Sequence, residues 1–181
     1  YTLHTLFPYT TLFRSLCTIM CAKAAGAAQV IALEMSGARK TKAREVGATH
    51  VLDPNECDAL AEVRRLTGGL GADVSFECIG NKHTAKLAID LIRKAGKCVL
   101  VGIFEEPSEF NFFELVATEK QVMGALAYNG EFADVIAFIA DGRLDITPLV
   151  TGRIQLEQIV GQGFEELVKN KEHNVKIIVS P

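Results

Sequence analysis

The chain has 181 residues, of which 49% are hydrophobic and 23% are charged, and its formal net charge is −3. A disordered chain would have fewer apolar residues and a larger net charge, so that class is excluded. The slight excess of acids argues against a nucleic-acid-binding protein. The five cysteines form no CxxC pair, so we expect a reduced, cytoplasmic setting rather than a disulfide scaffold.

No segment is predicted to cross a membrane. The most apolar early stretch, residues 16–33, is interrupted by Lys23, Gly26 and Gln29, whereas a span needs about 20 apolar residues. A secretory signal is not indicated either, because Pro8 and Arg14 break the first apolar run.

The first fifteen residues are interpreted as foreign to the natural sequence of the chain. Residues 5–15 read TLFPYTTLFRS, which resembles one frame of a sequencing-adapter oligonucleotide translated into protein. The alternative is a natural N-terminal extension. Because such scars are left out of fold reasoning, we expect residues 1–15 to be an artefactual or disordered tail and the genuine chain to begin near Leu16.

From Leu16 onward, helix and strand signals alternate. Apolar residues at helical spacing, with capping residues and terminal glycines, predict helices. The expected helices are 16–25, 37–46, 56–66, 82–93, 112–119, 131–140 and 156–168. Short apolar runs predict strands over 29–33, 49–52, 73–79, 97–103, 121–126 and 175–179. Ser36 is expected to cap the second helix, and Asn55 or Asp53 the third.

This alternation predicts an α/β fold with a doubly wound parallel sheet. Ligands of such sheets bind beyond the carboxyl ends of the strands. Glu34 ends the second strand that a dinucleotide fold would have, where an acid binds the ribose diol and favours NAD over NADP. A solvated acid near a helix N-terminus is the alternative. Arg39 could lie over the adenosine or be only a surface base.

The glycine-rich phosphate loop of a dinucleotide fold is missing. GxGxxG should precede the first helix, but the segment before Leu16 contains no glycine. Gly69-Leu70-Gly71 and Gly161-Gln162-Gly163 are interpreted as turns or caps. The histidines are scattered, so no metal-binding or catalytic set is nominated.

Several stretches, taken in order, carry a family resemblance. They are AKAAGAAQVIALE, REVGATHVLDP, LTGGLGADVSFECIG, AGKCVLVGIF and the terminal VKIIVSP. Together they resemble the cofactor-binding half of the zinc-dependent medium-chain alcohol dehydrogenases, from about Leu16 to Pro181. VLDP, VSFECIG, ATEK and GALAYNGEF favour the 2,3-butanediol dehydrogenases over the sorbitol dehydrogenases. The latter usually carry Arg where this chain has Ala127.

The resemblance implies a Rossmann-type doubly wound parallel sheet that is truncated, with strand one and the glycine-rich loop missing. It implies an NAD-binding domain over 16–127 and a C-terminal segment over 128–181 that returns toward an absent catalytic domain. A missing central strand leaves two rows of unpaired backbone groups. The strand-forming residues 9–13 could fill that place.

The cofactor contacts implied by the resemblance run from adenosine to nicotinamide. The adenosine end is assigned to Glu34, Arg39, Cys78 and Ile79. The nicotinamide end is assigned to Val101, Gly102, Ile103, Ala125, Leu126 and Ala127. Lys176 is assigned to the pyrophosphate and Tyr128 to the edge of the substrate pocket.

The resemblance further implies a C-terminal fragment of an enzyme that oxidises a small secondary alcohol or diol by hydride transfer to NAD, with a catalytic zinc in the full-length protein. Because the zinc ligands lie outside this chain, we expect no catalytic residue and no metal here, and an inactive fragment. The expected partners are a small-molecule alcohol and further copies of the chain, with no nucleic acid and no membrane. The alternatives are a sorbitol or polyol dehydrogenase, a non-catalytic nucleotide-binding module, and a methyltransferase.

Overall fold

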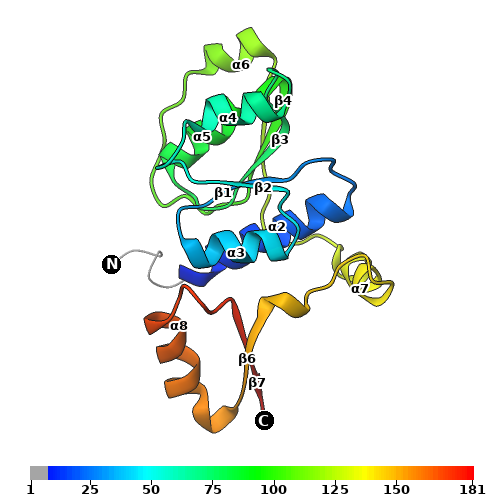
Figure 1. Cartoon of the computed structure of the whole chain (residues 1–181), viewed down its shortest axis with the longest axis vertical. Helices are drawn as coiled ribbons and strands as arrows, with labels where there is room; N and C mark the ends of the chain where they lie inside the picture. Colours follow the sequence, from blue (N-terminus) through cyan, green and yellow to red (C-terminus); the bar gives the residue numbers. More distant parts are fainter. Residues whose placement is uncertain (1–7) are drawn as a thin grey trace. The chain divides into compact units, whose positions relative to one another are not determined.

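The computed structural model describes residues 8–181, with side chains from Leu12 onward (Figure 1). By its internal contacts the chain forms two compact units. Unit 1 is Leu52–Ala127, and unit 2 combines the described residues up to Val51 with Tyr128–Pro181. The domain boundaries expected after residues 15 and 127 stay predictions.

Unit 1 is an alternating α/β unit. Its elements are α4 (Ala59–Leu66), β3 (Ala72–Glu77), α5 (Lys82–Leu91), β4 (Ile92–Leu100), α6 (Phe112–Thr118) and β5 (Gln121–Gly124). The strands form one parallel sheet in the order β3-β4-β5, with Glu77 opposite Leu100 and Leu100 opposite Gly124. The register therefore ends all three strands at one edge.

Helix α5 crosses from β3 to β4 and packs against both strands (Figure 1). Ala88 and Ile89 of α5 form a buried core with Ile92 and Cys98 of β4. Cys98 is fully buried, and burial raises the pKa of its thiol. The alternation of apolar residues along α5 fits a helix with one buried face, so this part of the predicted fold is confirmed.

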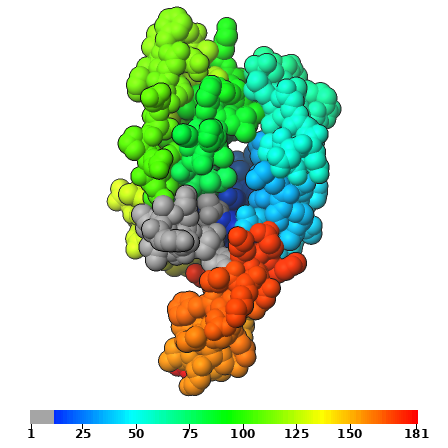
Figure 2. Space-filling model, turned by 90° about the vertical axis from the view of Figure 1, so that its left-hand side faces the viewer, coloured from blue at the N-terminus to red at the C-terminus, as the bar shows by residue number. Residues whose placement is uncertain are grey.

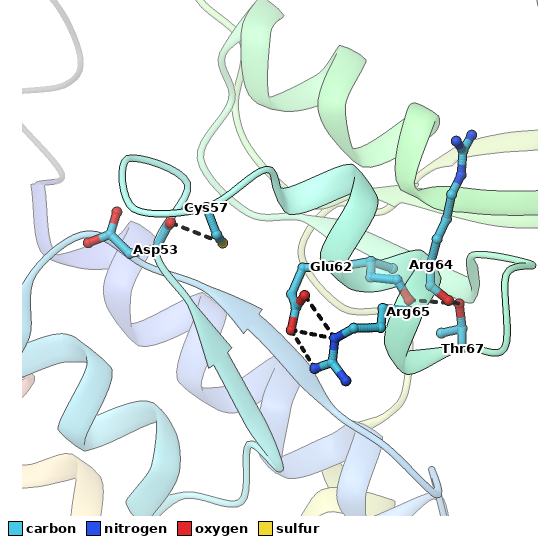
Figure 3. Close-up of polar contacts among 7 residues, drawn as sticks. Asp53, Cys57, Glu62, Arg64, Arg65 and Thr67 are labelled. Carbon is cyan, nitrogen blue, oxygen red and sulfur yellow. Dashed lines mark hydrogen bonds and ion pairs between the residues drawn. The ribbon is translucent and has the colours of Figure 1, made fainter.

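Local polar contacts fix the ends of α4. Asp58, not Asn55 or Asp53, is the N-cap, because its carboxylate accepts hydrogen bonds from Leu60 N (2.9 Å) and Ala61 N (3.1 Å). Glu62 and Arg65 form an ion pair one turn apart (Figure 3). The predicted turn over Gly69–Gly71 is confirmed, since both glycines have positive φ.

Unit 2 contains the remaining elements. In its first part lie α2 (Pro8–Ala24), β1 (Ile31–Leu33), α3 (Gly37–Glu45) and β2 (His50–Leu52). Its second part has α7 (Phe132–Ala140), η1 (Thr147–Leu149), β6 (Val150–Gln155), η2 (Leu156–Gln158), η3 (Ile159–Glu165), α8 (Glu166–Lys169) and β7 (Lys176–Ser180). β1 pairs with β2, and β6 pairs with β7 in parallel.

Helix α2 begins at Pro8 rather than Leu16, so the expectation that residues 9–13 could form a strand is wrong. Proline suits the first turn of a helix, because its missing N–H has no partner there. Leu12, Leu16 and Ile19 follow at helical spacing and are all buried in the core of unit 2. Burial of that face stabilises a helix where local propensity favoured a strand.

The prediction of one regular helix over 156–168 is wrong. The segment forms a 3-10 turn, the π-helix η3 and the short α8, so Gly161–Gly163 is neither a turn nor a cap. Its π-helix η3 packs against β6 and β7. The segment is coloured orange in Figure 2, and its side chains Val160, Phe164 and Val168 are exposed. Strand β6 was not predicted. In the part of the chain that the structure describes, no helix is long and apolar enough to cross a bilayer.

Replacing Leu12 by Ala tests whether the adapter-like segment belongs to the folded core. Leu12 is 6% exposed, so Leu12→Ala should lower the free energy of unfolding by about 2–4 kcal/mol in urea denaturation. The control is Leu70→Ala, since Leu70 is 71% exposed and its loss should change stability by less than about 0.5 kcal/mol. Equal stability of both variants would show that the segment does not pack.

Candidate functional site

Three backbone segments of unit 1 follow directly after the carboxyl ends of β3, β4 and β5. They are Cys78–Ile79, Val101–Ile103 and Ala125–Ala127. Backbone hydrogen bonds join them to the strand ends: Val101 N donates to Glu77 O (2.7 Å), and Ala125 N donates to Leu100 O (2.9 Å). The structure thus brings together all the predicted cofactor residues of unit 1 at the edge where ligands of parallel sheets bind.

Glu77, the last residue of β3, is a buried carboxylate at this edge and is only 3% exposed. Its side chain accepts hydrogen bonds from Ile79 N (2.9 Å), Gly80 N (2.9 Å) and Thr84 Oγ1 (2.8 Å). Its backbone carbonyl accepts from the N–H groups of Val101 and Gly102. A buried carboxylate is tolerated when such donors satisfy it, so Glu77 ties the loop after β3 to the loop after β4.

The same two loops touch backbone to backbone at two glycines. A Cβ on Gly80 would overlap the Ile103 backbone, and a Cβ on Gly102 would overlap Gly80 N and the Glu77 carboxylate. Gly80 also has φ +90°, where residues with a Cβ are strained. The fold therefore requires glycine at both positions.

The predicted residues of unit 1 differ in exposure. Cys78 is buried, whereas Ile79, Ile103 and Leu126 are more than half exposed. Ala127 has φ +56°, a left-handed conformation that is uncommon for alanine. This edge of the sheet therefore presents apolar side chains and backbone groups with no charged residue among the predicted contacts.

Glu34 and Arg39 lie in unit 2, Glu34 in the connection from β1 to α3 and Arg39 in the first turn of α3. Glu34 Oε1 accepts hydrogen bonds from Met35 N and Ser36 N, both at 2.9 Å. Arg39 Nη2 lies 3.3 Å from Glu172 Oε1. Ser36 is the N-cap of α3 as predicted, but its side chain makes no capping bond and donates to Glu172 instead.

Lys176 and Tyr128 also lie in unit 2, and their contacts are with other groups. Lys176 Nζ lies 5.5 Å from the centroid of the Phe13 ring. Tyr128 is 69% exposed and packs edge-on against Phe132. Their roles at the pyrophosphate and the substrate pocket stay predictions.

The described residues do not fit a metal ion, because no three of their His, Cys, Asp or Glu side chains form a group that could hold one. Cys17 and Cys21 lie one turn apart on α2. Burial, with a smaller effect of Cys21, raises the pKa of the Cys17 thiol to about 11, and burial also raises the pKa of Cys21. Both thiols are therefore kept in the protonated form, which is a poor metal ligand.

Glu77 and Glu172 were missed by the sequence analysis. Glu77 had a detectable signal, because an acid inside the apolar run DVSFECI needs a partner when the strand is buried. Glu172 had none, since it lies in the polar segment NKEHN.

An α/β unit whose parallel strands end in loops gathered at one edge has the architecture of a doubly wound domain, a class that binds its ligands at that edge. The sequence profile described as zinc-binding dehydrogenase matches residues 15–141. The chain therefore belongs to the zinc-binding dehydrogenase family, which confirms the predicted family and the Rossmann-type fold.

Individual relatives and solved structures show which dehydrogenases this chain is similar to. The (R,R)-butanediol dehydrogenase of Neisseria gonorrhoeae is 41% identical over 84% of this chain and 44% of the relative. The sorbitol dehydrogenase of Bacillus subtilis is 31% identical over 92% of this chain and 47% of the relative. The crystal structure of 2R,3R-butanediol dehydrogenase from B. subtilis superposes with a TM-score of 0.87, at 35% identity, over 93% of this chain and 48% of that one. The chain spans about half the length of the curated relatives it matches.

Gly102→Ala tests the close approach of the two loops. The added methyl group would overlap Gly80 and Glu77, so we expect a loss of about 1–3 kcal/mol in urea denaturation. Gly124→Ala is the matched control in the same sheet, because a Cβ there meets nothing within 4 Å. Equal effects of the two substitutions would contradict the described packing.

Glu77→Ala tests the carboxylate that orders the loop after β3. It removes the acceptor of two backbone N–H groups and the Thr84 hydroxyl, so unfolding free energy should fall by about 2–4 kcal/mol. Amide hydrogen exchange should accelerate selectively at Ile79 and Gly80. Glu106→Ala, at an exposed position of the same unit, should change neither quantity. Unchanged exchange at Ile79 and Gly80 would refute the role of Glu77.

Proposed function

We propose that the chain is the C-terminal, NAD-binding part of an alcohol dehydrogenase that oxidises a small secondary alcohol or diol, of the 2,3-butanediol type, by hydride transfer to NAD. The observation that carries the proposal is the convergence of three backbone segments at the carboxyl edge of β3, β4 and β5. The likeness to butanediol dehydrogenases over most of this chain supports the substrate class. A cytoplasmic location and a homo-oligomeric state belong to the same proposal.

Glu34 would bind the adenosine ribose. Two backbone N–H groups hold its Oε1, which fixes the carboxylate while Oε2 takes no part in those two bonds. A carboxylate held in this way can accept hydrogen bonds from a ribose diol and repels a phosphate at the 2′ position. The proposed cofactor is therefore NAD rather than NADP.

The nicotinamide end would lie against Val101–Ile103 and Ala125–Ala127. Gly102 and its neighbours present backbone to a flat ring, and the exposed side chains of Ile103 and Leu126 can cover its faces. Lys176 at the pyrophosphate and Tyr128 at the substrate complete the proposed assignments. Bound NAD accepts a hydride at its nicotinamide ring, and these residues would orient that ring. The zinc that the family name implies does not fit the described residues, so no step is derived through it.

A fusion protein tests this function. Residues 16–181 are joined to the N-terminal half of the B. subtilis butanediol dehydrogenase in place of that enzyme's own C-terminal half. We expect NADH production with 2,3-butanediol at a higher kcat/KM than with sorbitol, and none from the 181-residue chain alone. Glu34→Ala in the fusion should raise the KM for NAD about tenfold or more, because a charge-assisted hydrogen bond to the ribose is lost.

Two results would contradict the proposal. One is NADH production from butanediol by the chain alone. The other is a fusion that folds, as judged by circular dichroism, and oxidises neither alcohol. A preference for sorbitol would retain the dehydrogenase and reassign its substrate to a polyol.

A further inference from the structure

A carboxylate from the C-terminal part of unit 2 binds the start of α3. Glu172, which lies between α8 and β7, accepts a hydrogen bond from Ser36 Oγ at Oε2, and its Oε1 lies 3.3 Å from Arg39 Nη2. Ser36 and Arg39 are three residues apart on the first turn of the helix, so they share one face. A single side chain distant in sequence thus holds both donors.

Ser36 and Arg39 are donors of the kind that proteins use to bind phosphate groups. An Arg near the acid of the second strand accommodates the 2′-phosphate in NADP-binding domains, and guanidinium and hydroxyl groups bind phosphate oxygens strongly. Glu34 lies beside them, because its carboxylate accepts from Ser36 N. Both groups needed for a 2′-phosphate are therefore present at the place where one would lie.

Glu172 occupies these donors in the present structure. Arg39 also has a buried Nε with no hydrogen-bond partner, so Glu172 leaves part of its donor capacity unused. Buried donors are normally satisfied. A phosphate has more acceptor oxygens than a carboxylate, so it could also accept a hydrogen bond from Arg39 Nε, which Glu172 does not bind. Ser36 and Arg39 thus form a pair of donors suited to a phosphate group, and the carboxylate of Glu172 binds both of them.

We propose that Glu172 is a specificity-determining residue of the cofactor site. By binding Ser36 and Arg39 it withholds them from a 2′-phosphate, and its charge adds to that of Glu34. With Glu34 alone, the hydrogen-bond donors of Ser36 and Arg39 would stay accessible to a phosphate group. Glu172 binds both donors and so makes them inaccessible. This inference rests on the proposed function, because it assumes that the β1–α3 connection binds the adenosine of a dinucleotide.

Nucleotide fragments test this role on the full 181-residue chain. The probes are 5′-AMP and adenosine 2′,5′-bisphosphate, which differ only in the 2′-phosphate, with dissociation constants measured by NMR titration of the Ser36 and Arg39 amide signals. Glu172→Ala frees both donors and Glu172→Gln removes only the charge. Glu165→Ala is the matched control, since Glu165 pairs with Lys169 elsewhere in unit 2.

The wild-type chain should bind 5′-AMP more tightly than the bisphosphate. In Glu172→Ala the ratio of the two dissociation constants should shift about tenfold or more toward the bisphosphate, and in Glu172→Gln by less. The control should keep the wild-type ratio. Adding Arg39→Gln to Glu172→Ala should restore it, which a merely structural role of Glu172 would not produce.

The outcomes separate the two proposals. If both nucleotides bind and the ratio is unchanged in Glu172→Ala, or if both affinities fall by the same factor, the role of Glu172 is overturned while the proposed function stands. If neither nucleotide shifts the Ser36 and Arg39 signals in any variant, the dinucleotide site itself is contradicted, and the inference fails with it.

Discussion

A strand inside a parallel sheet must find backbone partners on both of its edges, and β1 and β3, which belong inside a doubly wound sheet, each pair on one edge only. β1 pairs with β2, and β3 pairs with β4. In a doubly wound sheet of this type the first strand lies between the second and the fourth, which correspond to β1 and β3. Within residues 8–181 no strand joins these two edges, so the sheet is in two parts that belong to different units. Each part must therefore be stabilised by its own core.

The candidate site follows from that division. In unit 1 the loops after β3 and β4 are held by Glu77 and by the contact of Gly80 with Gly102. The segment after β5 is held by the hydrogen bond from Ala125 N to Leu100 O, so this edge of the sheet is organised within unit 1. In unit 2 the connection from β1 to α3 is held by Glu34 and Glu172. A carboxylate therefore holds loop residues in each unit. Glu77 is buried and accepts mainly from backbone N–H groups, whereas Glu172 is partly exposed and binds the side chains of Ser36 and Arg39.

An element could be predicted from the sequence when the residues that determine it lie close together in the chain. Helix α5 and strand β3 were predictable because their apolar residues follow helical and strand spacing. The bounds of β4 were predicted wrongly, because the strand begins at Ile92, inside the helix expected over 82–93, and ends at Leu100 rather than at residue 103. Strand β6 was missed because VTGRIQ contains only two apolar residues, Val150 and Ile154, and a glycine, so it gains its order by pairing with β7. The start of α2 was missed because residues 5–15 were left out of fold reasoning, although Leu12 and Leu16 have helical spacing. Glu172 could not be found from sequence, since its contact joins residues 136 positions apart.

The most direct test of the account is the nucleotide sequence upstream of the Leu16 codon, read from a newly amplified source locus. We expect TLFPYTTLFRS to be absent and a strand followed by GxGxxG to stand there, preceded by a domain with Cys, His and acidic residues suited to zinc. That strand would pair with the free edges of β1 and β3. A locus that encodes TLFPYTTLFRS at this place would contradict the account, because the protein would then carry neither the central strand nor the phosphate loop at the place where the fold requires them.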